Sequence, residues 1–279
     1  MTMYRTLLFA LVLSPTLFAC EEALDEAIDA VATDNPEAEL AVDAMQQGSL
    51  EGALLAALLD NVELTDVLAD MAADGRLDLD TTFTPAGCIQ STLPPDSLSL
   101  TFDNCSGPYG LTGLSGAANL TFLNSGEEGV EVNLTAVGLQ VNGATVGVNV
   151  QGTASDSDSG VRQYDLITGG AGATRDGVPV GRAGNYTATV DAGCLVLEGA
   201  WSITIETDAK VASFTNFKRC ANACPDSGSL VWAGSELSSD DIVGGAEGLA
   251  LTFRNGSDTV AWVDGDAKAG VTRLECGGN

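Results

Sequence analysis

Hydrophobic and polar residues alternate with a period of two over most of the chain, from about residue 78 onward. The clearest example surrounds Asn142-Gly143, a dipeptide typical of a two-residue type I′ β-turn. Such a turn places three apolar pairs on one face of a hairpin: Val141 with Ala144, Leu139 with Val146, and Val137 with Val148. Upstream, residues 130–136 alternate in the opposite phase, which predicts a β-bulge near Ala136-Val137.

Further strands follow the same period. A second hairpin is expected at Asn255-Gly256, where a two-residue turn pairs Leu251 with Val260 and Leu249 with Trp262. The longest expected strand covers residues 195–206. Its apolar face consists of Leu195, Leu197, Gly199, Trp201, Ile203 and Ile205. Other strands are expected near 98–104, 110–123, 161–168, 184–190, 210–219, 229–235 and 270–276. The whole pattern predicts about a dozen antiparallel strands.

Between residues 21 and 80 the apolar residues recur at helical spacing instead. This segment holds 17 acidic residues and one basic residue, Arg76. Breaks at Asn35-Pro36, Gly48-Ser49 and Asn61 predict three or four short acidic helices. Asn35 before Pro36 is a plausible helix start, and Ser49 can cap a second helix. The apolar face of Leu50–Leu59 needs a partner, which is the β domain, the neighbouring helices or another protein.

The first twenty residues have the features of an export signal. Arg5 precedes the apolar run Leu7–Leu13, which is shorter than the roughly 20 apolar residues that span a bilayer as a helix. Leu17-Phe18-Ala19-Cys20 resembles the lipobox of bacterial lipoproteins, with bulky Phe18 as a departure from the usual pattern. The resemblance implies that Cys20 becomes the first mature residue and carries diacylglycerol on its sulfur and an acyl chain on its amine. The alternative is an ordinary cleavable signal followed by a cysteine.

The lipobox resemblance also implies a location and a set of partners. The protein is expected in the bacterial cell envelope, held to a membrane by palmitate-type acyl chains on Cys20. Since Glu21 follows Cys20, the resemblance favours the outer membrane.

The patterns together predict a signal peptide over 1–19, an acidic helical segment over 20–77 and an antiparallel β domain over 78–279. The expected fold class is mainly β. Short acidic α-helices come first, and a large antiparallel sheet, sandwich or barrel-like domain follows them. A curved or closed arrangement is expected because long open edges invite aggregation. Ala86-Gly87-Cys88 and Ala192-Gly193-Cys194 open similar hairpins. Either the domain has two related halves, about 86–190 and 192–279, or the similarity is chance.

The charge of the chain limits its partners. With 39 acidic residues, 11 basic residues and no histidine, the formal net charge is −28. A polyanion of this kind is not expected to bind nucleic acid. It could attract cations or basic partners, although a solvated acidic surface is the preferred interpretation.

Seven cysteines include the predicted anchor and leave six. An even number in an exported chain predicts disulfides. Two pairs flank turn signals symmetrically, which predicts cross-strand bridges Cys88–Cys105 and Cys194–Cys220. The remaining pair is then Cys224–Cys276, and a local Cys220–Cys224 bridge is the alternative.

No catalytic residue set is found, so the chain is not predicted to be an enzyme. The lack of histidine removes the usual base of Ser-His-Asp and Cys-His catalysis. No cofactor motif occurs. The acidic loops 156–160 and 264–266 do not match a calcium-binding loop and are typical of turns, so no metal site is predicted.

Two functions remain. The first is a structural or interaction lipoprotein of the envelope, with an unidentified envelope protein as partner. The alternative is a carrier of an apolar ligand in a curved β domain, with Leu50–Leu59 as a lid. That alternative predicts a cavity lined by Trp201, Ile203, Trp232 and Leu251.

Overall fold

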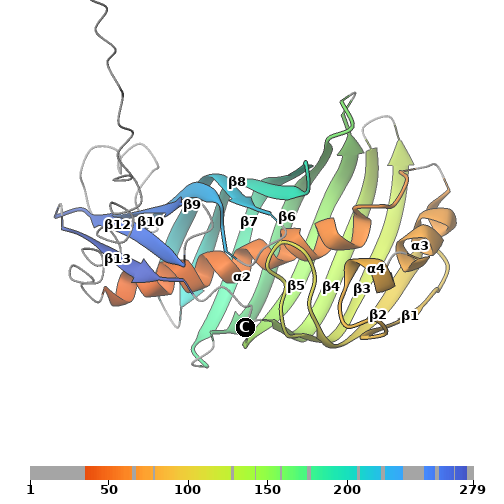
Figure 1. Ribbon diagram of the computed structural model, residues 1–279, viewed down its shortest axis with the longest axis horizontal. Helices are drawn as coiled ribbons and strands as arrows, with labels where there is room; N and C mark the ends of the chain where they lie inside the picture. The colour runs from red at the N-terminus through yellow and green to blue at the C-terminus, as the bar shows by residue number, and fades with distance from the viewer. Residues whose placement is uncertain are drawn as a thin grey trace, which may run out of the picture.

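A computed structural model describes residues 35–274, except for gaps at 65–66, 78, 127–128, 142, 158, 175–176, 206–207, 221–223, 235–247, 255–257 and 267. In these residues thirteen strands form one antiparallel sheet, in which each strand pairs with the strands before and after it in the chain (Figure 1). The strands are β1 (Ile89–Thr92), β2 (Ser97–Cys105), β3 (Leu114–Gly126), β4 (Gly129–Val141), β5 (Ala144–Asp156), β6 (Arg162–Ala173), β7 (Pro179–Asp191), β8 (Cys194–Ile205), β9 (Asp208–Arg219), β10 (Ser227–Gly234), β11 (Gly248–Arg254), β12 (Thr259–Asp264) and β13 (Ala269–Arg273).

The sheet is open, and its two edges are short. β1 has four residues and β13 has five, and the two do not pair with each other in the described structure. Short edge strands limit edge-to-edge association, which a closed barrel would prevent by having no edges. The prediction of a mainly antiparallel β protein is confirmed in its open-sheet form. The two predicted halves lie in this one sheet, because β7 pairs with β8 across their boundary.

The hairpin between β4 and β5 shows where a local pattern determines register. Val141 faces Ala144 and Leu139 faces Val146, as predicted. The expected bulge is also present, as a register shift between Ala136 and Leu139. The third predicted pair is wrong, because Val148 faces Ala136 and Val137 is 94% exposed. The bulge adds residues to β4 only, so Val137 leaves the buried face.

The predicted register of the β11–β12 hairpin is wrong by two residues. Leu251 faces Trp262 and Phe253 faces Val260. The pairs move because the connection contains more residues than a two-residue turn. A shift by an even number keeps the same side chains on the buried face, since side chains alternate with a period of two. The predicted turn residues, 255 and 256, lie outside the described residues.

The described helical region contains one long helix and two shorter ones, where three or four short helices were expected. The long helix is α2 (Pro36–Leu59), followed by α3 (Leu68–Leu77) and α4 (Leu79–Thr82). The predicted start is confirmed: the Asn35 side chain accepts hydrogen bonds from the amides of Glu37 and Ala38, and Pro36 follows it. The predicted break at Gly48-Ser49 is wrong, because α2 continues through both residues. Ser49 is no cap, since its hydroxyl donates to the Gln46 carbonyl one turn earlier at 2.8 Å.

The long helix α2 crosses the strands on one face of the sheet (Figure 1). It contacts the central strands β5 to β8 and also β11 and β13. Two glycines allow a close approach: a Cβ on Gly48 would lie 2.3 Å from Trp201 Cζ2, and one on Gly52 would lie 3.1 Å from the Tyr186 hydroxyl. The Trp201 ring in turn packs 4.2 Å from the Phe214 ring. The apolar face of Leu50–Leu59 therefore has the sheet as its partner, and the helical segment shares the core of the β domain.

The C-terminal end of α2 is also held by the sheet. Arg162 at the start of β6 donates from Nη1 to the Leu59 carbonyl, and its guanidinium forms an ion pair with Asp156 at 2.6 Å. A cation at this position satisfies a carbonyl that has no partner within the helix. The turn at Asp60 and Asn61, which the sequence places near a helix end, is confirmed.

The two disulfides predicted from turn symmetry are confirmed. Cys88 pairs with Cys105 and Cys194 pairs with Cys220, with Cα atoms 5.5 and 4.0 Å apart. The alternative Cys220–Cys224 bridge is therefore excluded. Cys224 is disulfide-bonded as well, and its predicted partner Cys276 lies outside the described residues.

Candidate interaction site on the outer face of the sheet

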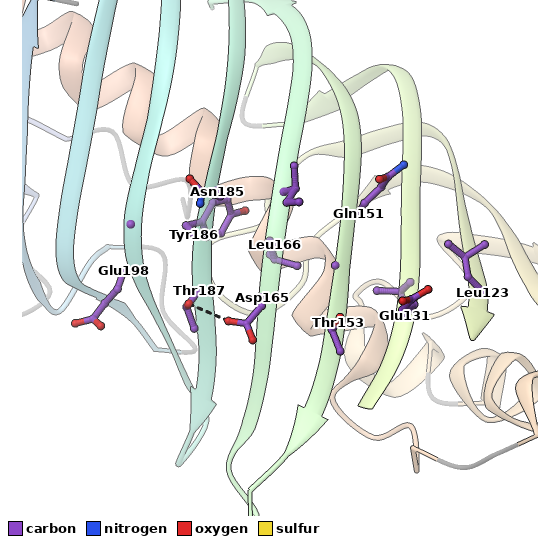
Figure 2. A pocket seen from close by; sticks show the side chains of 14 residues that line it. Leu123, Glu131, Gln151, Thr153, Asp165, Leu166, Asn185, Tyr186, Thr187 and Glu198 are labelled. Carbon is purple, nitrogen blue, oxygen red and sulfur yellow. Dashed lines mark hydrogen bonds between the residues drawn. The ribbon is translucent and has the colours of Figure 1, made fainter. Parts of the chain in front are cut away.

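The two faces of the sheet differ in what covers them. We call the face toward α2 the inner face and the opposite one the outer face. The outer face carries a hollow of about 670 Å³ across strands β3 to β8, which we call the outer trough (Figure 2). Its lining residues are Leu123, Glu131, Val132, Gln151, Gly152, Thr153, Asp165, Leu166, Ile167, Asn185, Tyr186, Thr187, Glu198 and Gly199. Among them Val132, Leu166 and Tyr186 are buried and belong to the core on the inner face.

The polar residues of the outer trough form a straight row across five strands. Strand register pairs each with the next: Glu131 with Thr153, Thr153 with Asp165, Asp165 with Thr187, and Thr187 with Glu198. Neighbouring strands lie roughly 4.7–4.9 Å apart. The backbone positions that carry carboxylates, on β4, β6 and β8, therefore recur at intervals of roughly 9.4–9.8 Å, with a threonine on each strand between them.

Hydrogen bonds hold parts of this row in place. The Thr187 hydroxyl donates to Asp165 Oδ1 at 3.1 Å, drawn as a dashed line in Figure 2. The Gln163 amide donates to the same carboxylate at 3.2 Å. At the β3 end, the Asn124 amide donates to Glu131 Oε2 at 2.7 Å.

A second row on the same face adds amide and apolar groups. Gln151 on β5 faces Ile167 on β6, which faces Asn185 on β7. Ile167 is 67% exposed and Leu123 on β3 is 45% exposed, so both present aliphatic surface to solvent. The described lining therefore contains three carboxylates, several neutral polar groups, two exposed aliphatic side chains and no basic side chain.

The carboxylates of the outer trough differ from the general acid of a glycosidase. All three carboxylates are exposed, whereas a general acid in a glycosidase needs burial or a close anionic neighbour to hold its proton. In the described part of the chain, no group of three or more acidic or cysteine side chains is placed to hold a metal ion.

Charged residues on the inner face have a different environment. Arg182 on β7 donates from Nη2 to Glu51 Oε1 of α2 at 2.9 Å, and both side chains are only 1% exposed. Burial raises the pKa of Glu51, although Arg182 opposes the shift. Arg182 also donates to Gln47 at 3.3 Å. This buried pair connects α2 to the centre of the sheet.

A second buried cation lies further along the same face. Arg219 at the end of β9 donates to the Ser49 hydroxyl at 3.3 Å, and its guanidinium lies 6.0 Å from the centre of the Phe217 ring. Burial lowers the pKa of Arg219 to about 10. The polar residues of α2 thus meet polar residues of the sheet, although the helix is largely buried.

The four residues predicted to line a cavity for an apolar ligand are buried. Trp201, Ile203, Trp232 and Leu251 are at most 2% exposed and belong to the core that includes the leucines of α2. The helix lies directly over Trp201 at Gly48. Leu50–Leu59 is thus part of the core and packs together with these four residues.

The acidic loops weighed for calcium use their carboxylates locally. Asp156 pairs with Arg162, and Asp264 accepts hydrogen bonds from the backbone amides of Asp266 and Lys268 at 3.0 and 2.8 Å. Lys268 also pairs with Asp266 at 3.1 Å. Both loops therefore have the turn structure expected from their composition.

The sequence reasoning did not identify the outer trough. The sequence shows its residues only as polar positions within strands in which polar and apolar residues alternate. Their alignment into one row depends on how five strands pair. Of the predicted site residues, the structure joins Cys88 with Cys105 and Cys194 with Cys220. The predicted anchor Cys20 lies outside the described residues.

Comparisons with protein-family models, with curated proteins and with solved structures found no match to this chain. None of the helices in the described residues combines the length and the apolar character that crossing a membrane requires. The function has to be argued from the site itself.

Proposed function

We propose that this chain is a non-catalytic interaction lipoprotein of the bacterial cell envelope, with the outer trough as its recognition surface. One observation carries the proposal. The inner face of the sheet is filled by α2, whereas the outer face presents a hollow of about 670 Å³ lined by exposed polar and aliphatic side chains. A large open hollow on an otherwise compact sheet is the default position for a binding site.

The carrier function is the weaker candidate because it needs the space that α2 occupies. Nineteen of the 24 residues of α2 are buried. Buried apolar area contributes roughly 25 cal/mol per Å², so removing the helix to admit a ligand would cost more than a typical apolar ligand returns. No comparable obstacle exists at the outer trough.

The proposed anchor explains how this β fold would act at a membrane. Acyl chains on Cys20 would hold the protein at the outer membrane, and at least two chains are needed because a single one binds only marginally. Substituting Cys20→Ala is expected to give a protein that lacks the acyl mass and stays with the precursor or soluble fraction. Normal processing and membrane retention of this variant would contradict the anchor.

Site-specific cross-linking in cells tests the recognition surface. A photoreactive residue placed at Thr153, in the middle of the outer trough, is expected to give a defined adduct with an envelope component. The matched control carries the same residue at Asp103, which is exposed on β2 outside the trough. Equal labelling from both positions, or none from Thr153, would count against the proposal.

A further inference from the structure

We infer that the outer trough binds an extended segment of polyproline II conformation that carries a basic side chain at every third residue. This inference deepens the proposed function and rests on it. It follows from three properties of the outer trough: the spacing of its carboxylates, its charge and its shape.

The spacing of the carboxylates selects the conformation of the segment. The backbone positions of Glu131, Asp165 and Glu198 recur at intervals of two strands, or roughly 9.4–9.8 Å, and their side chains can adjust around these positions. A polyproline II helix has three residues per turn and rises about 3.1 Å per residue, so every third side chain returns to the same face after roughly 9.3 Å. The two repeats therefore stay in phase over the three carboxylates.

Other regular conformations fit less well. In a β-strand the side chains on one face recur every roughly 6.6–6.8 Å, and residues three apart point to opposite faces. An α-helix returns to the same face after seven residues, or roughly 10.5 Å, and its diameter is about 10–12 Å with side chains. Over two intervals a helix would be out of phase by roughly 2 Å.

The charge of the outer trough selects basic side chains. Its lining has three carboxylates and no described cation. A second copy of this chain is an unsuitable occupant because the formal net charge of −28 would repel it. The chain's own residues 21–34 are also unsuitable, since they contain acidic residues and no basic ones.

The neutral residues of the outer trough complete the fit. Thr153 lies between two of the carboxylates and can donate to a backbone carbonyl, which stays unpaired in a polyproline II helix. The hydroxyl of Thr187 already donates to Asp165 and holds that carboxylate in place. Ile167 and Leu123 offer exposed aliphatic surface to proline rings and to the methylene groups of lysine.

The test measures binding of labelled twelve-residue peptides to the full chain in detergent by fluorescence anisotropy. One peptide has four repeats of Pro-Pro-Lys, a second has the same composition with its lysines in one block, and a third has Glu in place of Lys. At low salt the periodic peptide is expected to bind at least ~10-fold more tightly than the block peptide. Each of its three ion pairs in register contributes a small factor to the affinity. The Glu peptide is expected not to bind.

The affinity of the variant E131Q/D165N/E198Q for the periodic peptide is expected to be lower than that of the wild type by a similar factor. The matched control E39Q/D103N/D191N removes the same charge from exposed positions outside the outer trough and is expected to bind like the wild type. Because all six positions are exposed, both variants are expected to fold, which a thermal melt checks.

The outcomes separate this inference from the proposed function. Equal affinity for the periodic and block peptides, or equal losses in both triple variants, would overturn the inference. If no basic peptide binds but Thr153 still gives a specific adduct, the inference is wrong while the recognition surface stands. If both fail, the outer trough is not the site.

Discussion

The inner and outer faces of the sheet are made by the same strands and have opposite properties. On β6, Tyr164 and Leu166 point inward and are at most 2% exposed, while Asp165 and Ile167 between and beside them point outward. The inner face packs against α2 and buries the Glu51–Arg182 pair. The outer face leaves its carboxylates in water.

This difference shows what a charge contributes in each place. On the inner face, an ionised group must be matched by a partner because it has lost its hydration. On the outer face, a carboxylate costs little to keep and is available to a partner in solution. The inner face is therefore expected to determine stability and the outer face recognition, and four substitution experiments test this division.

The largest effect is expected from Arg182→Met. The variant leaves Glu51 buried without its cation, and loss of one member of a buried pair costs about 3–5 kcal/mol of unfolding free energy. The matched control is Lys210→Met, because Lys210 pairs with exposed Glu37 at 3.0 Å and surface pairs contribute about 0–1 kcal/mol. Urea unfolding with the disulfides intact measures both. Similar losses in the two variants would contradict the division between the faces.

Two glycine-to-alanine substitutions are expected to change the free energy of unfolding in opposite directions. Alanine is normally favoured over glycine in a helix by about 0.8–1 kcal/mol. At Gly48 the new Cβ would lie 2.3 Å from Trp201, so Gly48→Ala is expected to destabilise by about 1–3 kcal/mol. At Gly75 in α3 the nearest atom is 3.4 Å away, so Gly75→Ala is expected to stabilise. Thermal melts of the two variants compare the signs, and stabilisation by both would mean that α2 does not pack closely on Trp201.

The pH dependence of stability reports on Glu51. Burial raises its pKa in the folded state above the unfolded value. Its contribution to stability is then fully present below the unfolded pKa of about 4.3 and is lost as pH rises through the folded-state pKa. The stability of the wild type relative to Glu51→Gln is therefore expected to fall as pH rises above about 4.3. A relative stability that rises with pH would show that Arg182 outweighs the cost of burial.

The smallest effect on stability is expected from the outer face. E131Q/D165N/E198Q is expected to change the unfolding free energy by no more than about 0.5 kcal/mol, because surface substitutions away from special features have effects of this size. The comparison variant Leu166→Asn introduces the same side chain as Asp165→Asn one position along β6. It is expected to cost several kcal/mol, since Leu166 is 2% exposed. A large loss from the outer variant would give the outer row a structural role.

Local features of the sequence were sufficient for several parts of the fold. The period of two predicted the strands and which side of each is buried, because alternation is a property of a single strand. The start of α2 at Asn35-Pro36 was predictable because capping involves only adjacent residues. The pairs Cys88–Cys105 and Cys194–Cys220 were predictable because each closes one hairpin.

Tertiary structure decided the features that join distant segments. Gly48-Ser49 looked like a helix break, but packing against Trp201, more than 150 positions later in the chain, favours an unbroken α2. The outer trough has the same origin, since Glu131 and Glu198 share a row only because the registers between β4 and β8 place them there. Register depends on bulges and connection lengths, as the two-residue shift between β11 and β12 shows. The sequence by itself therefore determined most of the residues that face inward, because alternation is local, although the bulge in β4 turned Val137 outward. Only the assembled sheet decided what lies opposite them.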